Sequence, residues 1–262
     1  MHSRTPLLIT ALGLVFGTGC STLSVQRAAL DGVKTVAVVG YTANVRLRDP
    51  NDGSGGGVMG MVNNANAVAD MSSGEAQQKR LAQATETYDL LRAKVSEGSG
   101  WTVLSRDEVL ASPAYRQAFT EHRSAFAGMS QSMGDYRVVP EMLMHHTALE
   151  LTQAERNALM DELRVDALVM VAVNFVPGKQ TGFSMGIFGK TGVLPKAVVD
   201  LTMYDRTSPE PIWRDNAAEG QPASVGVETT MGYFNDDQLL NGMTEAAQSA
   251  YDVLMQRYRS GG

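Results

Sequence analysis

The chain has 262 residues, of which 44% are apolar, 19% are charged and one is cysteine, and its formal net charge is −6. This length and apolar fraction suit one domain with a hydrophobic core and exclude a chain that is disordered throughout. The acidic balance and the lack of a basic run argue against nucleic acid as a partner. A single cysteine excludes an internal disulfide framework and cysteine-rich metal sites.

The first nineteen residues have the pattern of a secretory signal peptide. Arg4 precedes an apolar run from Leu7 to Phe16, and the small residues 17–19 lead to Cys20. A short positive region, an apolar stretch and a small-residue exit are typical of an exported protein. The run is shorter than the ~20 apolar residues that a membrane-spanning helix needs. We therefore predict a signal peptide over residues 1–19.

Cys20 stands directly after the predicted cleavage position, with Thr18 and Gly19 before it. This arrangement resembles the lipobox of bacterial lipoproteins. The resemblance implies that the Cys20 thiol is lipidated, that the leader is cut before it and that the new amino terminus is acylated, which is enough for stable membrane anchoring. It also implies that Ser21 favours export to the outer membrane, facing the periplasm. An ordinary signal peptide that ends near a cysteine is the alternative.

The next part of the chain alternates between irregular and regular segments. Residues 20–32 are expected to form a lipidated polar tether, and the β-branched run 35–40 a buried strand. The Gly- and Asn-rich residues 42–71 predict a long flexible loop. A helix is expected from Ser72, where the spacing fits a capping box, to Gly98.

The second half of the chain predicts three strands in series. The continuous apolar run 167–176 requires a central strand covered on both faces. Residues 197–204 alternate as a strand with one buried face, and 212–215 open a returning strand. The other expected elements are a strand at 101–104, helices that begin at Ser105, Ser112 and Thr152, and a final helix from Asp236 to Arg259. The predicted fold class is α/β, with one domain over 33–262, a mixed sheet flanked by helices, and the order β-α-β-α-α-β-β-β-α.

Two local patterns bear on chemistry. Residues 182–186 match the G-x-S-x-G string of serine hydrolases, but no helix follows, and every histidine precedes Ser184, whereas that motif needs a later one. Soft and imidazole ligands also stand close together, as copper would require. These metal candidates are Met142, Met144, His145 and His146. Methionines more often fill a core, and adjacent histidines point in different directions, so we predict no metal, no cofactor and no catalysis.

Residues 177–195 are expected to form a β-hairpin arm between two strong strands. Exposed apolar residues on projecting segments suit partner binding, and so do those of the 42–71 loop. The candidate partner-binding residues are Val58, Met59, Met61, Phe183, Met185, Ile187 and Phe188. The same arm suits a channel subunit, although its strands are marginal against the ~9–11 residues that cross a bilayer.

With the lipobox and the strands at 35–40 and 167–176, the element order from 33 to 258 is similar to that of bacterial envelope lipoproteins related to CsgG, to the amino-terminal domain of TolB and to LpoB. The resemblance implies a lipid-anchored outer-membrane lipoprotein whose periplasmic α/β domain binds another envelope protein as an accessory or assembly factor. The alternative is a subunit of a ring-shaped, CsgG-like secretion channel. The expected partners are the membrane through Cys20, another envelope protein, and a second copy of the chain in the case of a ring.

Overall fold

The computed structural model describes residues 23–45, 74–122, 136–185, 188–224, 227–230, 233–234 and 236–261. The helices in these ranges are α1 (Arg27–Leu30), α3 (Gly74–Ser99), α4 (Arg106–Ala111), α5 (Pro113–His122), α7 (His145–Leu149), α8 (Gln153–Leu163) and α9 (Asp236–Ser260). The strands are β1 (Leu23–Val25), β2 (Thr35–Val45), β3 (Thr102–Val103), β4 (Tyr136–Val138), β5 (Ala167–Met185), β6 (Phe188–Asp205), β7 (Trp213–Glu219), β8 (Val227–Thr230) and β9 (Tyr233–Phe234).

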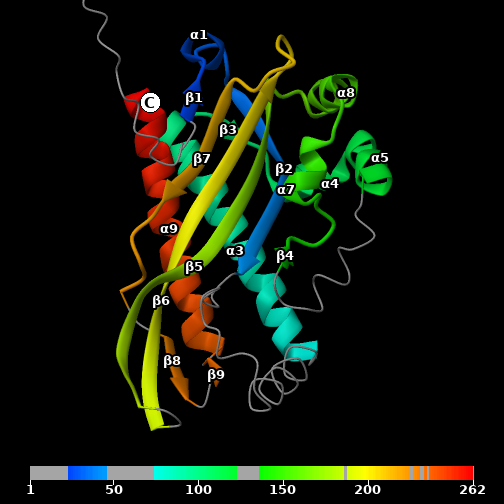
Figure 1. Cartoon of the computed structure of the whole chain (residues 1–262). Helices are drawn as coiled ribbons and strands as arrows, with labels where there is room; N and C mark the ends of the chain where they lie inside the picture. The colour runs from blue at the N-terminus through cyan, green and yellow to red at the C-terminus, as the bar shows by residue number, and fades with distance from the viewer. Residues whose placement is uncertain are drawn as a thin grey trace, which may run out of the picture.

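One mixed sheet forms the centre of the described molecule (Figure 1). Its strands follow the order β1-β7-β6-β5-β2-β3, while β4 pairs with β2, and β8 pairs with β6 and β9. The central strand β5 is parallel to β2 and antiparallel to β6. Its alternate residues Val169 and Val171 enter one core, and Leu168 and Met170 enter a second core on the opposite face. Burial on both faces explains the continuous apolar run and confirms the predicted fold class.

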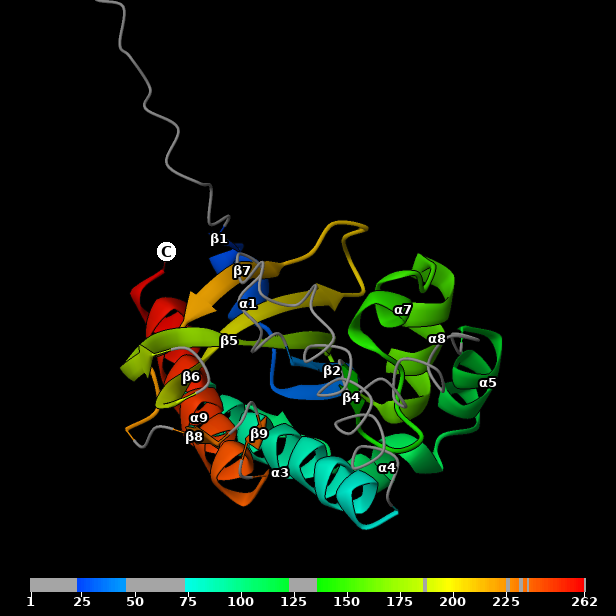
Figure 2. The same cartoon turned by 60° about the horizontal axis from the view of Figure 1, so that its bottom comes forward.

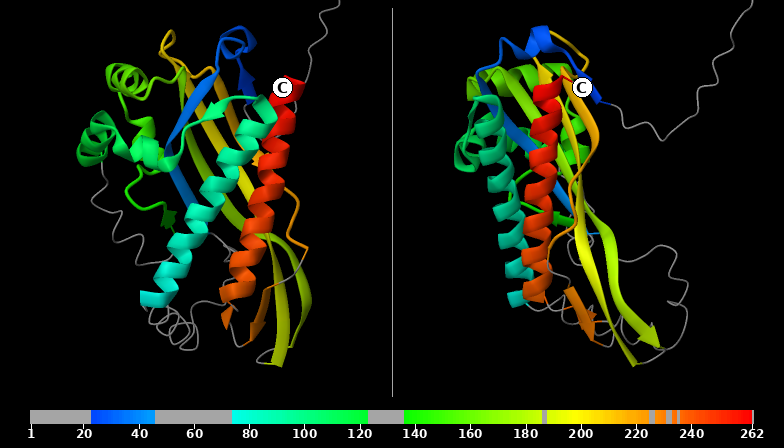
Figure 3. Two further views of the ribbon diagram at one scale, coloured as in Figure 1. Left: turned by 180° about the vertical axis from the view of Figure 1, so that it is seen from behind. Right: turned by 90° about the vertical axis from the view of Figure 1, so that its left-hand side faces the viewer.

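The long helices α3 and α9 lie side by side against one face of the sheet (Figure 3). Their buried residues, among them Leu91 and Ala247, share a core with β5, β6 and β7. Within it Tyr41 donates to Thr87 Oγ1 at 2.9 Å, and the hydroxyls of Tyr41 and Tyr251 lie 3.0 Å apart. These bonds satisfy polar groups that would otherwise be costly to bury.

The short helices α4, α5, α7 and α8 form a separate group beside the sheet (Figure 2). They enclose the second core, in which the Tyr115 hydroxyl donates to Val39 O at 2.8 Å and accepts from Leu143 N at 2.9 Å. Two of these helices begin with capping boxes, Ser105 with Glu108 in α4 and Thr152 with Glu155 in α8. Both are the helix starts that the sequence predicts. The Ser72 start lies outside the described residues, within which α3 begins at Gly74.

The predicted tether over 20–32 is wrong from Leu23 onward. β1 pairs antiparallel with β7 and extends the sheet at its edge, and Gln26 N donates to Ile212 O at 2.8 Å. Leu30 of α1 is 3% exposed and belongs to the α3–α9 core. These ten residues carry too few alternating apolar positions to reveal a strand, so the pairing partner decides their structure.

The strand β2 is longer than predicted, since it continues to Val45. Thr42–Val45 pair with β5 in parallel, so the predicted loop does not begin at 42, and residues 46–71 lie outside the described ranges. The short elements β1, α1, β4, β8 and β9 are additions to the predicted order, and α7 forms where no named element was predicted.

Candidate functional site

The candidate site is the arm formed by the distal halves of β5 and β6. The pairing of β5 with β2 ends at Phe175, and the pairing of β6 with β7 begins at Val198. Beyond these points residues 176–185 pair with 188–196 as an antiparallel hairpin. In Figures 1 and 3 this hairpin reaches away from the end of the molecule that carries β1 and the carboxyl terminus. The predicted hairpin arm over 177–195 is therefore present, with ten residues on one strand and nine on the other.

The base of the arm is packed tightly against the domain. Pro195 is buried, and its carbonyl accepts from Ala223 N at 2.8 Å. A Cβ at Gly178 would lie 3.0 Å from Leu194 O, and a Cβ at Gly242 of α9 would lie 3.2 Å from the Pro195 ring. Glycine lets backbone and helix approach this closely. The arm therefore leaves the domain from a fixed base.

A line of polar side chains joins four strands where the arm leaves the sheet. Asn44 donates to Asn174 Oδ1 at 2.7 Å, and Asn174 donates to Asp200 Oδ2 at 2.9 Å. The other carboxylate oxygen of Asp200 accepts from Ala217 N at 3.0 Å. This network fixes the strands against one another just before the arm. The sequence did hold a signal for it, because Asn174 is the polar interruption of the apolar run 167–176.

The predicted partner-binding residues fall into two groups. Phe183 and Met185 are in β5, Phe188 begins β6, and Met185 is the register partner of Phe188, so the structure brings these three backbones together on the arm. Ile187 lies outside the described residues, and so do Val58, Met59, Met61 and the lipidation candidate Cys20.

The structure does not bring the four metal candidates together. Met142 is buried in the core of α3 and α9, whereas α7, which carries the two histidines, packs against the opposite face of the sheet. Met144 is buried before α7, His145 is half-buried and His146 is exposed. Burial lowers the pKa of His145 to about 4. The four side chains therefore lie in different environments, and the structure does not group them as ligands of one ion.

No protein-family model matches the chain, and no curated protein matches its sequence. Among solved structures, the chain is similar to the crystal structure of lipoprotein GNA1162 from Neisseria meningitidis, with 11% identity and a TM-score of 0.26 over 81% of this chain and 94% of that chain. A likeness at this TM-score carries no argument about family or function. The resemblance to CsgG-related lipoproteins stays a prediction. Within the described ranges, no helix has both the length and the apolar character to span a membrane.

Proposed function

We propose that the chain is a lipid-anchored outer-membrane lipoprotein whose periplasmic domain binds another envelope protein without catalysing a reaction. The observation that supports this most is the arm, a hairpin that continues ten residues past the sheet from a packed base. Projecting segments on rigid scaffolds are where binding residues concentrate.

The position of β1 sets how far the arm reaches from the proposed anchor. Cys20 precedes Leu23 by three residues, so the two lie within about 11 Å of each other. Leu23 pairs with Asp215 of β7, Asp215 pairs with Leu201 of β6, and Leu201 pairs with Val171 of β5. Leu23 and Val171 therefore lie at the same level along the sheet. The end of the strand at Met185 is fourteen residues further along, about 45 Å. The arm therefore gives an anchored domain a reach of several nanometres.

The composition of the arm indicates the chemistry of its partner. Residues 176–197 contain Lys179, Lys190 and Lys196 and no aspartate or glutamate, although the whole chain has a net charge of −6. Lys196 pairs with Glu219 within the domain. A basic, partly apolar hairpin on an acidic protein fits a partner surface that carries carboxylates beside apolar residues.

Shortening the arm tests the proposal. Gln180 and Val193 are register partners, so residues 181–192 can be replaced by an Asn-Gly turn that closes the hairpin. We expect this variant to fold, because β5 and β6 pair with β2 and β7 over residues 167–175 and 198–203, outside the replaced segment. Cross-linking in cells from a photoreactive residue at Ser224, near the base, should then lose the partner that the wild-type chain captures.

A matched variant keeps the hairpin length and replaces Lys179 and Lys190 with glutamine. It should weaken capture and make the residual capture less sensitive to salt. Thermal melting of both variants shows whether the domain is intact. Equal capture by the folded short-arm variant and the wild type would refute the assignment of the arm.

A subunit of a ring-shaped secretion channel is the second candidate. The length of the arm favours it, since ten residues of β5 and nine of β6 fall within the ~9–11 that a bilayer-crossing strand requires. The mass of the detergent-extracted wild-type protein, corrected for detergent, separates the two candidates. A closed ring of many subunits would favour the channel, and a monomer or dimer would remove it.

A further inference from the structure

A cluster of three possible metal ligands lies far from the arm, where α5 ends and α8 begins. One ligand atom each from Glu121, His122 and Glu155 lie within 4.8 Å of one another. His122 Nε2 and Glu155 Oε1 are 2.7 Å apart, and the two side chains are only 19% and 29% exposed. The cluster joins two helices that are 30 residues apart in sequence. It plays no part in the proposed partner binding.

The surroundings hold two of these side chains in place. Glu155 Oε2 accepts from Thr152 N at 2.7 Å and from Thr152 Oγ1 at 2.6 Å in the capping box, which leaves Oε1 directed at His122. Gln117, one turn before Glu121, donates to Glu121 Oε1 at 3.0 Å. Hydrogen bonds of this kind orient metal ligands in proteins and are needed for affinity.

The charge of the cluster also favours a cation. The carboxylates of Glu121 and Glu155 lie close together. Among the described side chains, His122 is the basic group that pairs with a carboxylate of this cluster. A divalent cation would compensate both carboxylates and use the imidazole lone pair.

We propose that Glu121, His122 and Glu155 form a binding site for a divalent transition-metal cation of the Zn²⁺ type. Tetrahedral Zn²⁺ with bonds of about 2.0–2.2 Å places its ligand atoms about 3.4 Å apart. His122 Nε2 and Glu155 Oε1, now 2.7 Å apart, would separate by about 0.7 Å to meet this geometry, and the exposed Glu121 side chain would complete the set. Imidazole with two carboxylates selects such a cation over Mg²⁺ and Ca²⁺, which prefer oxygen ligands alone. Water would complete the coordination.

The test is calorimetric titration of Zn²⁺ into the tag-free mature protein, extracted in mild detergent and stripped of metal. We expect one saturable site per chain, no competition from Mg²⁺ or Ca²⁺, and a visible absorption band when Co²⁺ replaces Zn²⁺. His122→Ala and Glu121→Gln should each weaken Zn²⁺ binding by at least about tenfold. His146→Ala removes an exposed histidine elsewhere and should leave binding unchanged.

Melting in a chelator shows whether each variant is folded. If His122→Ala does not fold, Glu121→Gln decides the question alone, because the Glu121 side chain is exposed and outside both cores. Saturable binding that falls in His122→Ala and Glu121→Gln but not in His146→Ala supports the site. A wild-type protein that takes up no Zn²⁺, or equal binding in the folded cluster variants and the wild type, would overturn it.

Discussion

Asp215 is a charged residue in the middle of an apolar core. It has no exposed surface, and its neighbours in the strand include Trp213, which is also fully buried. Arg257 of α9 approaches Asp215 Oδ1 to 3.2 Å. Burial nevertheless raises the pKa of Asp215 to about 6, because desolvation outweighs the attraction of Arg257. The carboxyl group is therefore more easily protonated in the folded chain than in the unfolded one.

This shift predicts how Asp215 affects stability as the pH changes. Its stabilising contribution is complete below the unfolded pKa near 4 and is lost as pH rises through the folded pKa of about 6. Asp215→Asn removes the titration, so its unfolding free energy relative to wild type should rise by up to about 3 kcal/mol between pH 4 and pH 7. Urea denaturation at several pH values measures the difference.

Asp252→Asn is the control for the loss of one negative charge. Asp252 lies on α9, as Arg257 does, pairs with Lys94 at 2.6 Å and is 55% exposed. It should show little pH-dependent gain, because exposed ion pairs contribute about 0–1 kcal/mol. A flat difference between Asp215→Asn and wild type from pH 4 to pH 7 would contradict the buried-carboxyl account.

The helices and strands that could be predicted from the sequence are those marked by an apolar run or by helix-capping residues. The strands that became β2, β5, β6 and β7 and the capping boxes of α4 and α8 follow from apolar runs and cap residues. β1, β4, β8 and β9 span two to four residues each, too short for a period to be visible, and they exist because a neighbouring strand offers an edge. The arm could be predicted from alternation, but its packed base depends on contacts of Gly178 and Gly242 with distant residues.

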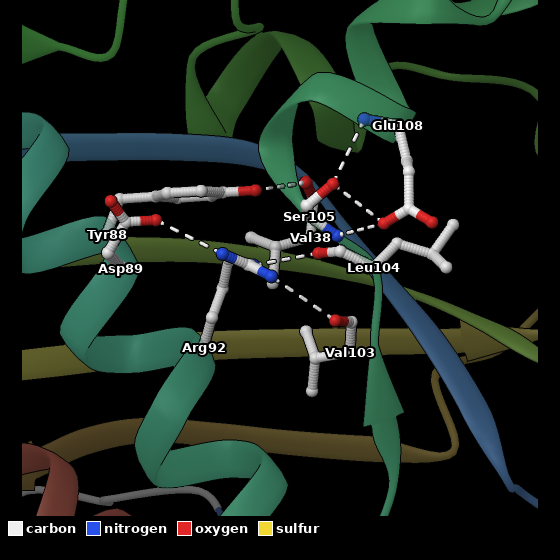
Figure 4. Close-up of polar contacts among 8 residues, drawn as sticks. All are labelled: Val38, Tyr88, Asp89, Arg92, Val103, Leu104, Ser105 and Glu108. Atoms are coloured by element: carbon white, nitrogen blue, oxygen red, sulfur yellow. Dashed lines mark hydrogen bonds and ion pairs between the residues drawn. The ribbon is translucent and has the colours of Figure 1, made fainter.

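Arg92 of α3 bonds to the backbone of the segment that leads from β3 to α4 (Figure 4). Arg92 of α3 donates through Nε to Leu104 O at 2.7 Å and through Nη2 to Val103 O at 3.3 Å. Its Nη1 also donates to Asp89 at 3.1 Å. The guanidinium thereby satisfies two carbonyls just before the Ser105 cap of α4. It positions α4 relative to α3.

Replacing Arg92 should therefore destabilise the domain more than replacing its acidic neighbour. Arg92→Met keeps the apolar stem and should cost about 1–3 kcal/mol, because carbonyls bonded to a charged group lose their partner. Arg92→Lys should recover only part of the lost stability, because an ammonium group lacks the planar fork that reaches both carbonyls. Chemical denaturation gives the values.

Asp89→Asn is the comparison, because it removes only an ion pair whose acidic side chain is 55% exposed. Its expected cost is below about 0.5 kcal/mol. Equal losses in Asp89→Asn and Arg92→Met would show that the ion pair, and not the carbonyl contacts, is what Arg92 contributes.

At the scale of the whole molecule, the fold places β1, α1 and the end of α9 together, with the arm at the other end (Figure 1). Arg27 of α1 lies 5.1 Å from the ring centre of Tyr258 in α9. The sequence predicted the α/β class and the hairpin, but the start of the domain could not be read from it, because β1 is defined by its pairing with β7.

Cys20→Ala tests the proposed membrane anchor. The variant should move from the membrane fraction to the soluble periplasmic fraction and should no longer incorporate a labelled fatty acid. Its melting temperature in solution should match that of the wild-type protein, because Cys20 precedes the first strand. Fatty-acid incorporation or membrane retention that persists in Cys20→Ala would contradict lipidation at this residue.

The packing of Arg27 against Tyr258 has a practical consequence for labelling. A fluorescent protein or affinity tag fused after residue 262 would stand beside the end of the domain that carries the proposed lipid anchor, where the membrane surface limits the space. A small reporter at the exposed Ser224, near the base of the arm, would leave that end unobstructed. We therefore expect an internal label to disturb the anchored protein less than a terminal fusion would when it is followed in living cells.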